Sequence, residues 1–132
     1  MLAALLWVPG SALAAPPELS ARLVCPPRPT PGRVVCEIEL EVDAGVLVWA
    51  DVLVVEAPPF AAPLRSRVGP PGLFMRSDRR QRLQLALAAT RAGSGVLRVR
   101  ARAVFCADAE QRACHPIVEA AEAPVQVGPI TE

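Results

Sequence analysis

The clearest pattern along the chain is a strict alternation of apolar and acidic residues between positions 34 and 42. The apolar positions, which share one face, are Val34, Cys36, Ile38, Leu40 and Val42, and the acidic positions on the other face are Glu37, Glu39 and Glu41. A period of two residues is that of a β-strand with one buried face. We therefore predict a strand here, with Cys36 pointing into the core.

Four further segments are predicted as strands. Residues 46–56 are rich in β-branched side chains and predict a central strand, or two strands with a kink near Ala50 and Asp51. Residues 82–88 alternate with a period of two although several of them favour helix, and residues 96–105 and 117–127 complete the set. Short strands between turn signals, with no convincing helix, predict an all-β sandwich in a single domain.

The segment of residues 60–80 interrupts these strands and is rich in proline, glycine and charge. It surrounds one apolar triplet, Leu73–Met75. A loop of this length in a compact domain is often functional. The alternative is a short edge strand at the triplet, which the pattern supports equally.

Arginines form a stripe on the predicted strand of residues 96–105, where Arg98, Arg100 and Arg102 alternate with apolar side chains. We expect this stripe to be a solvated strand face, because exposed cross-strand ion pairs are individually weak. The alternative is that it pairs with the glutamates of residues 37–41, if those two strands are neighbours.

The first fourteen residues have the features of a cleavable secretory signal. They carry no charge, are apolar up to Val8, break at Pro9–Gly10 and end in Ala12-Leu13-Ala14. The apolar run is too short to span a bilayer, which takes roughly 20 residues. No basic residue precedes it, so either the start lies upstream or the signal is atypical. We expect residues 1–14 to be removed and residues 15–132 to form one periplasmic or secreted domain without stable membrane insertion.

Charge and motifs exclude several functions. The 14 basic residues, all arginine, nearly balance 13 acidic ones, so we expect no nucleic-acid partner. The chain has no GxSxG motif and a single histidine, His115, which argues against a hydrolase. Its cysteines lack zinc-site spacing, and Cys114 with His115 supplies too few ligands for copper. We expect no metal and no cofactor.

Four cysteines in an exported chain favour disulfides, and local pairing is the simplest of the three possible arrangements. Cys25 and Cys36 bracket a proline-rich loop and are expected to form a structural staple. Cys106 and Cys114 bracket a short polar loop that directly follows a strand. An exposed disulfide there is reachable by a partner's thiolate, although spacing alone favours a second staple.

The segment around this second pair resembles a known family. The run Val99-Arg-Ala-Arg-Ala-Val-Phe-Cys106-Ala-Asp-Ala109, followed by Cys114-His-Pro116, is similar to the redox segment of the amino-terminal periplasmic domain of the DsbD thiol–disulfide interchange proteins. Residues 40–49 resemble a strand–Asp–Gly–hydrophobic segment of the same family. The likeness spans roughly residues 34–127.

This resemblance implies an immunoglobulin-like sandwich whose paired cysteines carry electrons. Cys114 would form the mixed disulfide and Cys106 would resolve it. Their positions next to the cysteines predict, apart from the resemblance, that His115 stabilises a thiolate there and that Asp108 opposes it. Phe74, in the loop of residues 69–80, would be the aromatic residue of a cap over the cysteines. The implied partners are a membrane thiol reductase as electron donor and periplasmic disulfide proteins as targets.

A second hypothesis is a non-catalytic sandwich that binds a partner and uses both disulfides as staples. The proline-rich loops and the lack of an acid–base constellation motivate it. The two hypotheses differ in whether the Cys106–Cys114 bond exchanges with other thiols.

Overall fold

The computed structural model describes residues 18–69, 73–76, 79–107 and 113–129, without the side chains of residues 73–76. Within these residues the chain forms nine strands and no helix. The strands are β1 (Leu19–Val24), β2 (Gly32–Val42), β3 (Val46–Glu56), β4 (Ala61–Pro63), β5 (Arg67–Val68), β6 (Leu73–Arg76), β7 (Arg80–Ala89), β8 (Gly93–Cys106) and β9 (Cys114–Val127).

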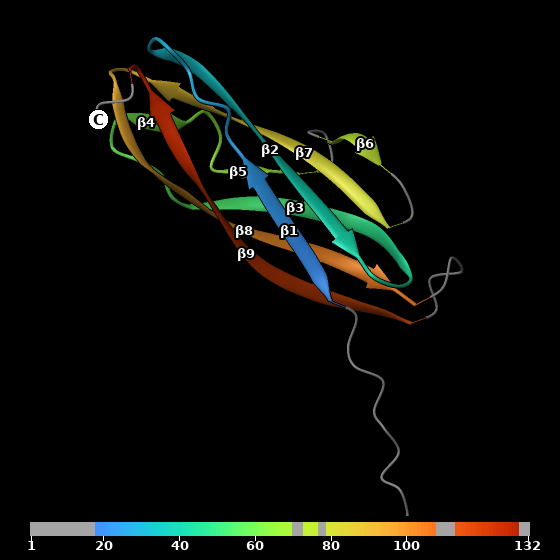
Figure 1. The fold of residues 1–132 in the computed structure, drawn as a ribbon. Helices are drawn as coiled ribbons and strands as arrows, with labels where there is room; N and C mark the ends of the chain where they lie inside the picture. Colours follow the sequence, from blue (N-terminus) through green and yellow to red (C-terminus); the bar gives the residue numbers. More distant parts are fainter. Residues whose placement is uncertain (1–17, 70–72, 77–78, 108–112, 130–132) are drawn as a thin grey trace, which may run out of the picture.

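The strands form two antiparallel sheets that pack face to face (Figure 1). Sheet A has the order β1-β2-β7-β4, with β6 also paired to β7, and sheet B has the order β5-β3-β8-β9. This is the strand order of an immunoglobulin-like sandwich, in which the β1–β2 and β8–β9 hairpins each stay within one sheet while the chain crosses between the sheets from β2 to β3 and from β7 to β8. The all-β sandwich expected from the sequence is therefore confirmed.

The core lies between the sheets and follows the alternation seen in the sequence. The inward positions of β2 and β7 are fully buried or nearly so, and β8 and β9 contribute the opposite wall. Cys36 is 0% exposed, as its place on the apolar face predicts. In β7 the period of two outweighs the helix preference of leucine and alanine, because only a strand buries Leu83, Leu85 and Leu87 together.

The proline-rich stretch between β3 and β7 contains three very short strands. Two of them, β4 and β6, pair with opposite ends of β7, and β5 pairs with β3. The edge strand that was the alternative for Leu73–Met75 is thus present as β6. The preceding β3 is one continuous strand, and its irregularities fall between Leu47 and Trp49 and between Val54 and Glu56.

Cys106 and Cys114 lie at one end of the sandwich, together with several strand ends and turns. The β2–β3 turn, the start of β7, and the ends of β8 and β9 that carry Cys106 and Cys114 all lie there (Figure 1). The backbone N–H of Val42 donates to the carbonyl of Arg79 at 3.0 Å, which ties β7 to the end of β2. Short β6 lies at this end as well.

Candidate functional site

Cys106 and Cys114 form a disulfide across the β8–β9 hairpin. They are the last residue of β8 and the first of β9, stand directly opposite each other in the register, and have Cα atoms 4.0 Å apart. Beyond them, the N–H of Ala107 donates to the carbonyl of Ala113 at 2.9 Å. Two antiparallel strands therefore place both sulfurs at the end of sheet B.

The two halves of this disulfide differ sharply in exposure. Cys106 is 0% exposed, whereas Cys114 lies on the surface. A thiolate from another molecule approaches an exposed sulfur far more easily than a buried one. The geometry therefore leaves the residue Cys114 accessible from outside and encloses Cys106.

Cys106 is held in place by the β2–β3 turn. Gly45 in this turn has a φ of 77°, in the left-handed region that favours glycine. A Cβ atom at this position would lie only 2.5 Å from the carbonyl oxygen of Cys106 and would collide with the ring of Phe105. The close approach packs the turn directly against the end of β8. The backbone at Cys106 is therefore held by this turn and by its pairing with β9.

The Cys25–Cys36 disulfide has a different environment. It also joins neighbouring antiparallel strands, but both of its residues belong to the core, at 9% and 0% exposure. The loop it closes is attached to sheet B, since the N–H of Arg28 donates to the carbonyl of Gln126 at 2.9 Å and the N–H of Gly128 to the carbonyl of Arg28 at 2.8 Å. This disulfide therefore anchors a loop that ties the two sheets together.

A buried carboxylate lies on the same sheet as the exposed disulfide. Asp51 of β3 is 0% exposed and accepts a bidentate pair of hydrogen bonds from Arg102 of β8, one of them 2.8 Å long, and another from Arg67 of β5. Arg102 also lies 5.8 Å from the ring centre of Trp49, within cation–π range. The hydrogen bond from Arg102 lowers the pKa of Asp51 against the opposing effect of burial, and Arg67 adds to the lowering.

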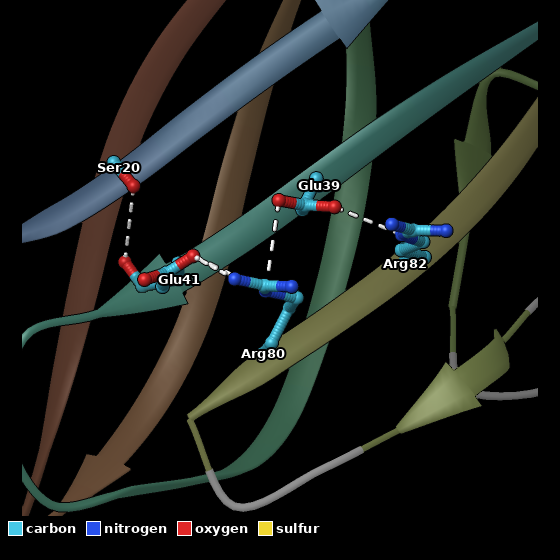
Figure 2. Close-up of polar contacts among 5 residues, drawn as sticks. All are labelled: Ser20, Glu39, Glu41, Arg80 and Arg82. Atoms are coloured by element: carbon cyan, nitrogen blue, oxygen red, sulfur yellow. Dashed lines mark hydrogen bonds and ion pairs between the residues drawn. The ribbon is translucent and has the colours of Figure 1, made fainter.

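The glutamates of β2 and the arginines of β8 do not pair with each other, contrary to one of the two expectations. β2 and β8 lie in different sheets, so the glutamates of residues 37–41 do not meet the arginines of β8. Figure 2 shows that Glu39 and Glu41 pair instead with Arg80 and Arg82 of β7, at 3.0 Å for Arg80–Glu41 and 2.8 Å for Arg82–Glu39. Charges of β7 therefore neutralise the outer face of sheet A.

The arginine stripe of β8 is also more than a solvated face. Arg98 pairs with Glu56 of β3 at 3.1 Å and with Glu122 of β9 at 3.2 Å, and Arg102 binds Asp51 as described above. Arg98 and Arg100 are solvent-exposed, as expected for a solvated strand face. The register also sets acidic residues of both neighbouring strands beside the stripe, so Arg98 and Arg102 form ion pairs as well.

The supporting residues expected from the resemblance are only partly placed. His115 is exposed, follows Cys114 directly and stands opposite Phe105 in the register. Phe74 belongs to β6, at the cysteine end of the sandwich, but its side chain falls outside the described part. Asp108 lies outside the described residues altogether.

Two features of this region were not predicted from the sequence. The first is the burial of Asp51 between two arginines, which the sequence indicates only by a single charge within an apolar strand. The second is a groove of about 820 Å³ that begins beside Cys114, lined by Glu18, Leu19 and residues 115–119. No local pattern marks this groove, since it forms where the start of β1 faces the start of β9.

Comparison with known proteins adds no relative. A scan against protein-family models finds no match, and a search of curated proteins finds none either. No helix in the described part of the chain is long and apolar enough to cross a membrane. Among the same residues, no three His, Cys, Asp or Glu side chains are grouped so that they would hold a metal ion.

Proposed function

We propose that this protein is an exported thiol–disulfide exchange module that works through Cys106 and Cys114. The observation that carries the proposal is the contrast between its two disulfides. Cys25–Cys36 is enclosed in the core, whereas Cys106–Cys114 exposes one member at the end of a hairpin. The resemblance to the DsbD amino-terminal domain supports the same pair and the same direction of attack.

The exchange follows from the exposure of the two cysteines. In the reduced form, the Cys114 thiolate attacks a sulfur of the target's disulfide, forms a mixed disulfide, and releases the target's other sulfur as a thiolate. The Cys106 thiolate then attacks the Cys114 sulfur, which re-forms the Cys106–Cys114 bond. The target leaves with both cysteines reduced, having received two electrons. A membrane thiol reductase would reload the protein by the reverse steps.

Trapping the mixed disulfide tests this proposal. Cys106→Ala leaves Cys114 without its resolving partner, so the variant should accumulate disulfide-linked complexes with oxidised periplasmic proteins. The matched control, Cys114→Ala, exposes no attacking sulfur and should accumulate none. A second control, Cys25→Ala/Cys36→Ala, should retain exchange if it remains folded. Equal amounts of disulfide-linked complex in the Cys106→Ala and Cys114→Ala variants would overturn the assignment of Cys114 as the attacking cysteine.

A second candidate function is a non-catalytic binding module with two structural disulfides. The direct opposition of Cys106 and Cys114 in the hairpin register favours it, because such a bond staples two strands. It predicts that Cys106→Ala/Cys114→Ala lowers the melting temperature and leaves the thiol state of periplasmic proteins unchanged. Loss of partner reduction at an unchanged melting temperature would exclude it.

Export is part of the proposal. Residues 1–14 lie outside the described residues, so the expectation stands on their sequence. Mass analysis of the protein recovered from the periplasm or medium should give a chain that begins at Ala15. A chain that retains residues 1–14 inside the cell would contradict export.

A further inference from the structure

The exposed disulfide belongs to the outer face of sheet B. β8 and β9 pair along their whole length without a register shift, so side chains at alternate positions of each strand share a face. The odd positions of β8 from Leu97 to Phe105 are buried against the other sheet. The even positions of both strands therefore face away from the core, and they include Cys106, which is covered there, and Cys114, which is exposed.

Exposed apolar side chains are concentrated on this outer face. Among the described residues, six large apolar side chains are exposed, and three of them, Val55, Val96 and Val118, lie here. Val118 is 55% exposed and stands four positions beyond Cys114 on β9, with the exposed Pro116 between them. A strip of exposed apolar side chains rimmed by charge is typical of a protein-interaction surface, and this one begins at the exposed cysteine.

The charges of this face leave one arginine without a partner. The carboxylates that the structure describes here are all paired with arginines: Asp51 with Arg67 and Arg102, and Glu56 and Glu122 with Arg98. Arg100 forms no ion pair with any described residue. Its neighbours across the sheet are the uncharged Leu53 and Ala120. The outer face of sheet B thus carries an uncompensated positive charge at Arg100.

A hollow of about 370 Å³ lies beside Arg100 on this face. It is lined by Val55 of β3, by Arg98 and Arg100 of β8 and by residues 120–122 of β9. Because Arg98 already donates to Glu56 and Glu122, Arg100 is the lining group that can still pair with a carboxylate. The hollow therefore suits an acidic side chain next to an apolar one. It lies six positions from Cys114, or about 20 Å along β9.

We propose that the outer face of sheet B docks the exchange partner through a segment that carries an acidic residue about 20 Å from its reacting cysteine. The inference rests on the proposed function and adds the recognition of its target. The partner's carboxylate pairs with Arg100, an adjoining apolar side chain enters the hollow beside Val55, and the partner's disulfide meets Cys114. A second copy of this chain fits less well, because it brings the same uncompensated arginine to the contact.

The kinetic test uses the Cys106→Ala variant, with Cys25–Cys36 left intact, and a peptide that reads the same in both directions. The peptide is acetyl-Glu-Leu-Thr-Ser-Thr-Ser-Cys-Ser-Thr-Ser-Thr-Leu-Glu-amide. A glutamate lies six positions from the cysteine on either side, so the result is independent of the direction in which the peptide crosses the sheet. Control peptides carry Gln in place of both glutamates, or Ser in place of both leucines.

The peptide cysteine carries an uncharged thiopyridyl group as the leaving group. The Cys114 thiolate attacks the peptide sulfur, a Cys114–peptide disulfide forms, and the electron pair of the broken bond leaves with the pyridine thiolate, whose release is followed by its absorbance. We expect the Glu peptide to react about two- to fivefold faster than the Gln peptide at low salt, because an exposed ion pair contributes this much. The difference should disappear at about 1 M salt.

Further variants, made in the same Cys106→Ala background, locate the contact. Arg100→Gln should remove the preference for Glu, whereas Arg33→Gln, which removes an exposed arginine from the outer face of sheet A, should preserve it. Val55→Ser should slow the peptide with leucines and leave the rate of the peptide with serines unchanged. Equal rates for the Glu and Gln peptides on the unmodified face, or an equal loss in Arg100→Gln and Arg33→Gln, would overturn the docking surface.

Binding to the oxidised wild-type protein tests the docking surface without any exchange. The same peptide with Ser in place of Cys should shift the backbone amide resonance of Ala120 and the side-chain Nε–H resonance of Arg100, and the Gln peptide should shift neither. An absence of shifts at millimolar peptide would overturn the docking surface, whatever the behaviour of the cysteine variant.

The uncharged small reagent dithiodipyridine distinguishes the two proposals. If it reacts with Cys114 while the peptides show no preference, the docking surface is wrong and the exchange function stands. If it fails to react in the folded Cys106→Ala variant, Cys114 is inaccessible and both proposals fail. Sedimentation of the wild-type protein tests the remaining occupant, because a dimer that Arg100→Gln dissociates would mean that a second copy, and not the exchange partner, covers this face.

Discussion

Replacing Asp51 by asparagine removes the buried charge that Arg102 and Arg67 share while keeping the shape of the side chain. A hydrogen bond to a charged group contributes roughly 1.5–3 kcal/mol, and Asp51 accepts three of them. The two arginine side chains are 41% and 54% exposed, so water solvates them again when the carboxylate is gone. We therefore expect a net loss of about 2 kcal/mol at neutral pH, or about 6–10 °C in melting temperature for a domain of this size.

The pH dependence of this loss identifies its cause. The pKa of Asp51 is lowered in the folded state, from an ordinary value of 3.8, chiefly by the hydrogen bond from Arg102. The contribution of the carboxylate is therefore complete above that ordinary value and disappears as the pH falls through the lower pKa of the folded protein. Thermal unfolding of wild type and Asp51→Asn should differ by a constant amount from pH 7 to pH 5 and converge below about pH 4.

A matched control compares the loss of this buried charge with the loss of an exposed one. Glu56→Gln breaks an ion pair with Arg98 in the same sheet, but both side chains are more than half exposed. It should unfold with wild-type stability at every pH. A difference between Asp51→Asn and wild type that persists unchanged at pH 2, or that is absent at pH 7, would show that the buried charge of Asp51 is not the cause of the loss.

The remaining predictions concern the cysteines and their supports. Cys25→Ala/Cys36→Ala should lower the free energy of unfolding by about 2–4 kcal/mol in urea titrations, because the bond closes a loop that ties the sheets together. An unchanged midpoint of urea unfolding would contradict a stabilising role for the Cys25–Cys36 disulfide. Gly45→Ala should cost about 2 kcal/mol, since its Cβ meets Phe105 at a positive φ, and should cost more than Gly32→Ala, which also has a positive φ but open space around it. Equal costs for the two glycine variants would show that the close contact has no effect.

Much of the fold follows from local sequence patterns. The alternation at Val34–Val42 predicts both the strand and its buried face, because burial of one face is a property of the strand itself. The same reasoning gives β7 in spite of its helix-favouring residues. The local pairing of the cysteines was also predicted correctly, since turn-connected strands bring Cys25 to Cys36 and Cys106 to Cys114.

The ion-pair partners and the burial of Asp51 could not be predicted from the sequence, because they depend on which strands are neighbours. The partners of Glu39 and Glu41 are arginines of β7 because β7 lies beside β2, which no local pattern reveals. The burial of Asp51 depends on the meeting of three strands that are far apart in sequence. For the same reason, the unequal exposure of Cys106 and Cys114 within one disulfide and the groove beside Cys114 became visible only in the folded chain.

The proposed function requires that the Cys106–Cys114 disulfide exchanges with other thiols. Titration of the mature protein in thiol redox buffers, with peptide mapping of each cysteine pair, measures the reduction potentials of both disulfides in one experiment. We predict that Cys106–Cys114 titrates above about −300 mV, within reach of thiol reductases, while Cys25–Cys36 stays oxidised to lower potentials. A Cys106–Cys114 potential below about −300 mV would mark the bond as structural and contradict the proposed function.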